Sequence, residues 1–366
     1  MKLICNKEQF LKAASLTTQV IASRLSLPVL GNLLLEAASG MLKITGTNLE
    51  TTIIHQIGVK IEEGGETTVP ARFLIDFCQA ATDEKVLIKT VKDSVLLESG
   101  AARATLLTIN ASEFPKAAGF DIESELELGK QDFLETVSAI SFCAAAEEGR
   151  PVLTGVLIKA EAGKLTLVAT DGYRLGRNES KFSGNFELLI PARALQEAVK
   201  AITDQEDETI KLAIDKEKNQ ARISTKNLTI VSRLLEGSYP NYEQIIPSSF
   251  ISTVRVNTKE LTDAVKLASL FARDVGNVAR IELDSGKLKL TGATSQVGDA
   301  ETEMKADIEG EKISVAFNSR FLLDSLSALK DQETEISLSG GTSAAIFRGS
   351  THKNLSFVIM PVRPQG

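Results

Sequence analysis

The chain has 366 residues, and domains usually span about 100–200 residues, so its length is that of two or three domains. Hydrophobic residues make up 43% and charged residues 24%, which is typical of a folded globular protein and excludes a largely disordered one. The formal net charge of −7 excludes a protein that binds nucleic acid mainly through bulk positive charge.

Membrane, secreted and metal-binding classes are also disfavoured. The first ten residues lack the apolar segment of a signal peptide, and no run of residues is apolar for long enough to span a bilayer. The cysteines are Cys5, Cys78 and Cys143, an odd and widely spaced set that suits a reduced compartment. His55 and His352 stand alone. We therefore expect a cytoplasmic protein with no metal and no membrane partner.

The predicted elements, taken in chain order, form one unit that occurs three times. Each unit opens with an amphipathic segment typical of a helix, at 8–22, 131–145 and 259–273. Two strands around a glycine-containing turn follow, at 33–50, 156–173 and 279–296. A further strand then leads into a second helix, at 67–81, 187–201 and 314–329. Repetition at this scale points to three copies of one domain.

Prolines support the same division. Seven of the nine fall at positions that match between units, namely 28/151, 70/191 and 115/240/361. Pro70 and Pro191 are expected in the first turn of a helix, where the missing N–H does no harm. The sequence thus predicts an α+β protein of three similar domains, at 1–122, 123–250 and 251–366. Each would pack two helices on antiparallel sheets.

Six segments, the last of them near the end of the chain, resemble one family. They are LPVLGNLLLE (27–36), TGTNLE (45–50), TVPAR (68–72), VATDGYRL (168–175), EGSYPNYEQIIP (236–247) and VIMPVR (358–363). Together they closely resemble the bacterial DNA polymerase III β subunits, the replicative sliding clamps. The resemblance implies the DNA-clamp fold and a head-to-tail homodimeric ring around double-stranded DNA. It also implies a non-catalytic subunit that tethers the polymerase to its template.

A ring of this kind needs a weakly basic inner surface. We counted charges over each predicted helix with its flanking residues, at 7–24, 70–81, 129–146, 191–202, 257–273 and 318–330. These segments carry a net charge of +4, so the rest of the chain carries −11 and the total is −7. Arg72, Arg193 and Arg320 occupy the same place in the three units, where they would contact phosphates without reading bases. The alternative is that each only pairs with a neighbouring acid. The resemblance adds Arg24 and Arg150 to the DNA-facing set.

The resemblance also predicts a groove for short partner peptides. Its lining is Leu153, Thr170, Gly172, Tyr173, Arg174, Leu175, Pro240, Val358, Met360, Pro361 and Arg363. The partners implied are the catalytic subunit of DNA polymerase III, the clamp loader and other proteins with a clamp-binding motif. Apolar walls with an adaptable methionine suit a site that several partners share. The alternative is that Asp171-Gly172 is only a hairpin turn and Met360 only core.

This sequence departs from the family in several places. Gln244 and Phe321 stand where a basic residue and a tyrosine are common, and Pro364–Gly366 extends the usual short tail, so peptide preference would differ. Glu147 stands where the family has a DNA-facing polar residue, which argues against that DNA contact in this chain.

At the seam between protomers, the resemblance implies that the strand 101–108 meets the end of the helix 259–273 of the partner. Leu106 would pack against Leu270 and Phe271. Arg103 would face an acid in the partner, Asp299, Glu301 or Glu303.

Two other kinds of protein remain as alternatives. An enzyme is disfavoured because the sequence contains no dinucleotide-binding, P-loop or nucleophile-elbow motif, and we expect no cofactor. A scaffold built from the same repeats could bind peptides without ever encircling DNA, and only topology separates it from a clamp.

Overall fold

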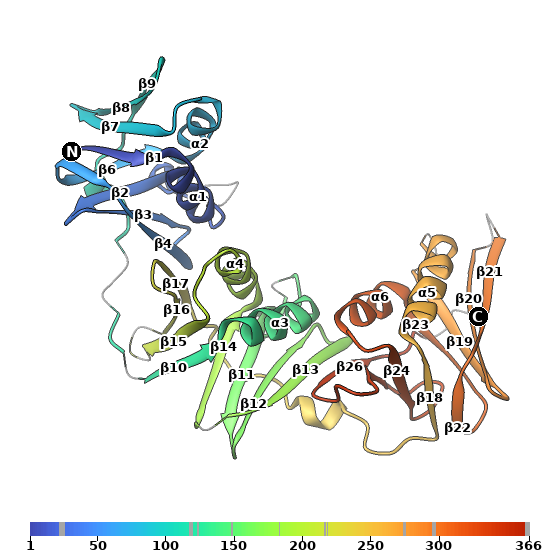
Figure 1. Cartoon of the computed structure of the whole chain (residues 1–366). Helices are drawn as coiled ribbons and strands as arrows, with labels where there is room; N and C mark the ends of the chain where they lie inside the picture. The colour runs from blue at the N-terminus through green and yellow to red at the C-terminus, as the bar shows by residue number, and fades with distance from the viewer. Residues whose placement is uncertain are drawn as a thin grey trace. The chain divides into compact units, whose positions relative to one another are not determined.

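The computed structural model describes residues 1–21, 26–116, 120–122, 124–147, 149–182, 184–215, 217, 219–273, 276–294 and 298–362. Internal contacts divide the chain into two compact units, Met1–Leu134 with Gln196–Leu234, and Glu135–Leu195 with Leu235–Gly366. The α-helices of the described residues are α1 (Lys7–Thr18), α2 (Ala71–Ala80), α3 (Lys130–Ile140), α4 (Ala192–Thr203), α5 (Thr258–Ala272) and α6 (Ser319–Ala328) (Figure 1). Along the chain, α3 crosses from the first unit into the second and α4 crosses back.

The first unit contains two antiparallel sheets. The five-stranded sheet has the order β5 (Lys60–Glu63), β1 (Lys2–Asn6), β7 (Lys85–Val91), β8 (Ser94–Ser99) and β9 (Ala102–Leu107). The eight-stranded sheet has the order β10 (Ser124–Gly129), β15 (Thr209–Asp215), β16 (Gln220–Ser224), β17 (Leu228–Arg233), β4 (Thr51–Gly58), β3 (Met41–Thr47), β2 (Asn32–Ala38) and β6 (Gly65–Pro70). Helices α1 and α2 pack against each other, and α1 also packs on β3 and β4 (Figure 1).

The second unit follows the same design. Its nine-stranded sheet has the order β14 (Phe186–Pro191), β11 (Gly155–Glu161), β12 (Lys164–Thr170), β13 (Arg174–Lys181), β26 (Leu355–Ile359), β25 (Ala345–Gly349), β24 (Glu333–Leu338), β18 (Ser252–Asn257) and β22 (Asp307–Gly310). Its four-stranded sheet has the order β21 (Gly298–Lys305), β20 (Lys287–Thr294), β19 (Val278–Asp284) and β23 (Ile313–Asn318). Helices α5 and α6 pack together as α1 and α2 do. The predicted α+β fold with antiparallel sheets is confirmed.

The threefold repeat recurs in the backbone hydrogen bonds. The first helix of each repeat begins with an N–H that donates to a carbonyl before a later strand, at 2.8 Å in all three cases: Lys7 to Glu84, Lys130 to Glu208 and Thr258 to Gln332. We call these the helix-start bonds. They give a common origin for counting residues in the three repeats.

Tight turns join the predicted hairpins. Both central residues have positive φ in all three turns, at Ser39-Gly40, Ala162-Gly163 and Ser285-Gly286. This is the conformation of the type I′ turn, which matches the twist of paired strands and favours glycine at its second central position. The glycine in each predicted hairpin therefore has a physical role.

Close helix–sheet packing explains two further glycines. A Cβ on Gly46 of β3 would lie 2.2 Å from the carbonyl oxygen of Thr17, and one on Gly292 of β20 would lie 2.2 Å from that of Ala268. No side chain fits in such a space, so glycine lets α1 and α5 approach their strands. The two glycines are therefore equivalent positions in the first and third repeats.

Two helices end earlier than predicted. The segment 8–22 is helical only to Thr18, because the hydroxyls of Thr17 and Thr18 donate to the carbonyls of Ala13 and Ala14 and loosen the last turn. The segment 131–145 is helical to Ile140 and continues as a 3₁₀ turn over Ser141–Cys143.

Both large sheets run across the predicted domain boundaries. β4 of the first repeat pairs with β17 of the second, and we call this pairing the first junction. β13 of the second repeat pairs with β26 of the third, and we call this the second junction (Figure 1). The repeats are therefore joined by backbone hydrogen bonds as well as by the chain.

The structure corrects two points about the prolines. Pro70 and Pro191 end strands β6 and β14, and their helices begin one residue later. Met360-Pro361 directly follows β26, whereas Phe114-Pro115 and Tyr239-Pro240 lie well beyond the ends of β9 and β17. The three dipeptides are therefore not equivalent, because strand pairing rather than spacing to the next proline defines the repeat.

The described helices include none that is long and apolar enough to cross a membrane. Cys5, Cys78 and Cys143 are free and buried, and burial raises the pKa of Cys5 to about 12 and that of Cys78 to about 11. These thiols remain protonated and unreactive near neutral pH.

His55 should make folding stability depend on pH. It lies on β4 between β3 and β17 and is 8% exposed. Burial lowers the pKa of His55 below its ordinary 6.5, so the unfolded chain takes up the proton more readily than the folded chain. We expect the free energy of unfolding to fall as pH drops below about 6.5. His55→Gln should flatten that dependence in urea titrations. Each free energy of unfolding is compared with that of the same chain at pH 8. If the variant loses as much stability below about pH 6.5 as the parent chain does, groups other than His55 cause the pH dependence.

Candidate functional site

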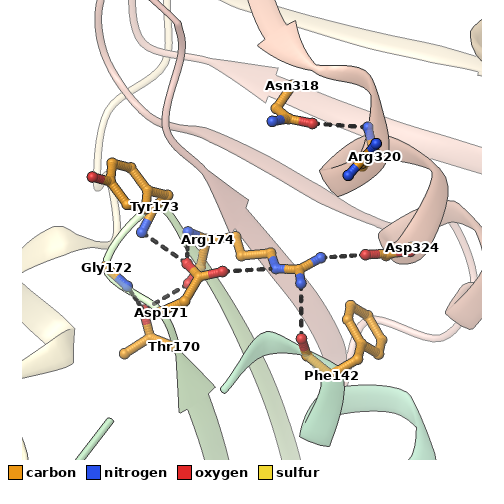
Figure 2. Close-up of polar contacts among 9 residues, drawn as sticks. All are labelled: Phe142, Thr170, Asp171, Gly172, Tyr173, Arg174, Asn318, Arg320 and Asp324. Carbon is orange, nitrogen blue, oxygen red and sulfur yellow. Dashed lines mark hydrogen bonds and ion pairs between the residues drawn. The ribbon is translucent and has the colours of Figure 1, made fainter. Parts of the chain in front are cut away.

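Four of the eleven predicted groove residues, Thr170, Gly172, Tyr173 and Arg174, lie at the turn between β12 and β13 (Figure 2). Thr170 Oγ1 accepts the N–H of Gly172 at 3.1 Å and donates to the carbonyl of Arg174 at 2.6 Å. Asp171 Oδ1 accepts the N–H groups of Tyr173 and Arg174, both at 2.9 Å. Gly172 has a φ of +90°, which glycine adopts without strain. The turn leaves the Tyr173 side chain 68% exposed.

Arg174 is held by a polar network (Figure 2). Its Nε donates to Asp171 Oδ2 at 3.1 Å, its Nη1 to Asp324 Oδ2 at 2.5 Å and its Nη2 to the carbonyl of Phe142 at 2.8 Å. The guanidinium carbon lies 5.3 Å from the ring centre of Phe142 and 4.5 Å from that of Phe321. Burial alone would lower the pKa of Arg174, but the bond to Asp324 and the nearby charges raise it overall. The side chain therefore stays charged although it is only 12% exposed.

The predicted groove residues divide into a buried and an exposed set. Those that are buried are Leu153, Thr170, Leu175 and Val358. Arg174 and Pro361 are half-buried, and those that are exposed are Gly172, Tyr173, Pro240 and Met360. Arg363 and the tail Pro364–Gly366 lie outside the described residues. The exposed set is the part that a partner could contact directly.

One apolar cluster underlies this surface. Leu175 of β13 and Val358 of β26 are buried in it together with Tyr242, and Tyr239 packs against it. Burial raises the pKa of both tyrosines, so they are neutral near pH 7. The N–H of Met360 donates to the carbonyl of Tyr173 at 2.8 Å, which brings these two exposed residues together where Tyr173 precedes β13 and Met360 follows β26.

Three residues of the Arg174 network were not predicted. The sequence predicts Asp171 only as part of a hairpin turn and gives Phe142 and Asp324 no role in the site. Arg174 and Asp324 are 150 positions apart in the sequence, so no local sequence pattern predicts their pairing. Phe321, noted for its departure from the family, lies against Arg174.

The arginines predicted to face DNA are exposed. Arg72 is 91% exposed and lies 4.0 Å from Asp76, which is a loose pair. Arg193, Arg320 and Arg150 are exposed too, and within the described part of the chain no carboxylate lies within 4.0 Å of the Arg193 or Arg320 guanidinium. The fifth predicted arginine, Arg24, lies outside the described residues. Glu147, the acid at a position where the family has a DNA-facing polar residue, is exposed. Of Arg72, Arg193 and Arg320, only Arg72 has a neighbouring acid within 4.0 Å in the described part of the chain, and that ion pair is long.

The predicted seam residues lie on two sheet edges and one helix. Arg103 is on β9, the last strand of its sheet, and pairs with Glu98 at 2.5 Å. Leu106 is half-buried against its own core, whereas Leu107, which was not predicted, is 80% exposed. On α5, Leu270 is 63% exposed and Phe271 is half-buried.

Metal ligands are not clustered in the described part of the chain, where no group of histidine, cysteine, aspartate and glutamate could hold an ion. Acids and bases on the outer strands instead pair with each other, as Lys287 does with Glu303 at 2.8 Å.

Comparison with known proteins identifies relatives over the full length. Residues 1–118, 127–241 and 243–363 match the family models of the N-terminal, central and C-terminal domains of the DNA polymerase III beta subunit. A Synechocystis protein named "Beta sliding clamp" is 30% identical over 390 residues, covering 99% of both chains. The "Beta sliding clamp" of Haemophilus influenzae is 29% identical, covering 99% of this chain and 100% of that protein.

Solved structures share the fold. The DNA polymerase sliding clamp from Bacillus subtilis superposes with a TM-score of 0.94 at 26% identity and covers 99% of both chains. The DNA polymerase III subunit beta from Pseudomonas aeruginosa superposes with a TM-score of 0.93 at 26% identity, over 99% of this chain and 100% of that one.

Proposed function

Because this chain belongs to the DNA polymerase III beta subunit family, the sliding clamps, we propose that it encircles duplex DNA as a homodimeric ring. The family is a non-catalytic processivity factor, so the expected absence of enzymatic activity follows from membership. The proposal includes three domains at 1–122, 123–250 and 251–366, action in the cytoplasm, and a partner-binding surface at the second junction. The observation that carries it is the matching register of the two junctions.

Equivalent residues meet at both junctions. Counting from the helix-start bonds through the paired strands makes Ala104 of β9, Ile230 of β17 and Phe357 of β26 equivalent. At the first junction Ile230 lies opposite Ile53, and at the second Phe357 lies opposite Gly176. β9 belongs to the same series, but it is the outermost strand of its sheet. Among the described residues, β9 pairs with β8 alone, whereas β17 and β26 each have a second partner strand.

β21 has the complementary position. Gly46, which touches α1, pairs with Ile53, and the equivalent Gly292, which touches α5, pairs with Ala300. Ala300 of β21 is therefore the third-repeat equivalent of Ile53, and β21 is also the outermost strand of its sheet. A third junction between two chains would place Ala104 opposite Ala300. Two such seams close a head-to-tail dimer of six repeats.

The chemistry at that register is complementary. Arg103 would lie opposite Glu301, and Thr105 opposite Asp299. Opposite charges directly across an antiparallel pair stabilise it. The exposed apolar side chains Leu107, on β9, and Leu270, near the end of α5, would gain cover from pairing of the edges. Both bare edges would also be removed, which protects against aggregation.

Exposed arginines support a DNA-facing role for the helices. Arg72, Arg193 and Arg320 begin α2, α4 and α6 at matching places, and Arg150 is exposed before η4 (Pro151–Thr154). Few and loosely placed cations suit a ring, because contacts to phosphate carry no sequence information and strong ones would slow sliding. Glu147 is exposed at the position where the family has a DNA-facing polar residue, and because an acid repels phosphate we propose no phosphate contact there.

Partners would bind at the surface formed by Tyr173, Pro240 and Met360, with Arg174 beside it. The catalytic subunit of DNA polymerase III and the clamp loader are the proposed partners, each through a short peptide. An exposed aromatic and an adaptable methionine above a firm apolar cluster are typical of such a site.

Retention on circular DNA tests the proposal. The clamp is loaded by its loader and ATP onto a closed circle that carries one nick, and the complex is washed at high salt. Salt screens phosphate contacts, so only enclosure keeps the protein bound. We expect retention on the circle and release when a restriction enzyme linearises it. Equal loss from circular and linear DNA would contradict the ring and favour a peptide-binding scaffold.

A further inference from the structure

The chain contains a second copy of the partner-binding turn. Between β3 and β4, Thr47 Oγ1 accepts the N–H of Leu49 at 3.1 Å, as Thr170 does for Gly172. Asn48 Oδ1 accepts the N–H groups of Glu50 and Thr51 at 3.0 and 2.7 Å, as Asp171 does at the second junction. A backbone bond from the neighbouring strand's end completes the match, since the N–H of Arg233, the last residue of β17, donates to the carbonyl of Glu50 at 2.9 Å, as that of Met360 does to Tyr173. The two turns have the same design.

The first-junction turn forms without an arginine. Its equivalent of Arg174 is Thr51, and its equivalent of Gly172 is Leu49, which adopts a φ of +78° although leucine is strained there. The hydrogen bonds are nevertheless all present. Backbone and short polar side chains are therefore sufficient to build this turn. The Arg174 network is therefore not needed to form the turn, and what it adds is a link that holds the formed turn and the guanidinium to α6.

The equivalent of Asp324 makes the same point. Arg193 and Arg320 are each the second residue of their helices. Four residues further on, Glu197 of α4 therefore corresponds to Asp324 of α6. Glu197 pairs with Lys200 within its own helix at 3.4 Å. Asp324 instead reaches the neighbouring repeat and binds Arg174 at 2.5 Å. Only the junction that bears the exposed Tyr173 and Met360 has this link.

Removing a guanidinium from water is costly unless each N–H finds a partner. Three of the five donors of Arg174 have partners, contributed by Asp171, Asp324 and Phe142. Asp171 links Arg174 to the turn, because its Oδ2 accepts from Arg174 and its Oδ1 accepts the N–H of Tyr173. A continuous chain of bonds therefore runs from Asp324 of α6 to the backbone of the exposed Tyr173.

We propose that Asp324 is a positioning residue for partner binding, which fixes Arg174 and, through Asp171, the Tyr173 turn. This inference rests on the proposed partner site. Asp324 is supplied by the third repeat and the turn by the second, so the surface is complete only when the two repeats are joined. Binding is tighter because the turn and Arg174 are already ordered before the peptide arrives.

Asp324→Ala in the full-length clamp tests this role. The probe is a fluorescein-labelled peptide with the clamp-binding motif of the polymerase III catalytic subunit, and its Kd is measured by fluorescence anisotropy. Loss of one hydrogen bond to a charged group predicts binding about tenfold weaker. Glu197→Ala removes the equivalent carboxylate at the first junction and should leave the Kd unchanged. Asp324→Glu, which keeps the charge, should recover part of the affinity.

A double-mutant cycle with Arg174→Ala separates positioning from general stability. If Asp324 acts through Arg174, its loss has little further effect on the Kd when Arg174 is already absent. Additive effects of the two changes would overturn the inference, as would an unchanged Kd in Asp324→Ala. Thermal unfolding of each variant shows whether lost affinity merely follows lost folding. If the parent chain itself fails to bind the probe, the proposed partner site is wrong, and this is a different outcome from failure of Asp324 alone.

Discussion

Replacing Arg103 with glutamate is expected to turn the dimer into a monomer at micromolar concentration. The proposed register puts residue 103 opposite Glu301 of the partner, and Glu98 lies beside it on β8. Three carboxylates would then meet where Arg103 had lain between two acids, and Lys289, 3.1 Å from Glu301, would be the remaining cation beside them. Like charges facing each other across an interface cost several kcal/mol, and a ring has two such seams. Sedimentation velocity over a range of concentrations measures the result.

Charge exchange gives the decisive version of this experiment. A chain with both Arg103→Glu and Glu301→Arg restores the opposite pair with its sign reversed, so the dimer should return. Lys89→Glu makes the same change in net charge on β7, an inner strand, and should remain dimeric. Retention on circular DNA should be lost in Arg103→Glu and recovered in the exchanged chain. If a folded Arg103→Glu variant stays dimeric, the proposed register is wrong.

The repeat and the local structure could be predicted from sequence because their causes are local. Glycines in the turns at Gly40, Gly163 and Gly286 have the positive φ that type I′ turns require. Helix starts were predictable as well, since Asn6, Asn257 and Asn318 accept first-turn N–H groups of α1, α5 and α6. Such signals act within a few residues and are readable in one segment.

Pairing between distant strands was not predictable in the same way. The strand pairings that follow each helix-start bond set the true equivalence of the repeats, and they show that Met360-Pro361 does not match the other two proline dipeptides. The side-chain directions on β9 also depend on its sheet, which leaves Leu107 exposed and turns Leu106 toward the core. The Arg174–Asp324 bond arises only after two repeats have joined. These features follow from tertiary contacts that no sequence window contains.

Truncating Tyr173 and Met360 to alanine is expected to abolish partner binding while leaving the ring intact. Their side chains are 68% and 44% exposed, so little folding energy depends on them. The backbone bond from Met360 to Tyr173 survives both changes, since no side-chain atom takes part. An anchoring aromatic contributes about 2 kcal/mol at a binding surface, which is about thirtyfold in Kd, and the double variant should fall below detection with the same labelled peptide.

Matched variants come from the first junction. Glu50 and Arg233 occupy the places of Tyr173 and Met360 around the equivalent turn, with the same backbone bond at 2.9 Å. Glu50→Ala with Arg233→Ala should bind the peptide as the parent does, because a polar pair offers no apolar anchor. The Tyr173→Ala, Met360→Ala clamp should remain a dimer in sedimentation velocity, yet fail both to be loaded by the clamp loader and to make the polymerase processive. Normal peptide affinity in that variant would place the partner site elsewhere, and parallel loss in the Glu50, Arg233 variant would mean that both junctions bind.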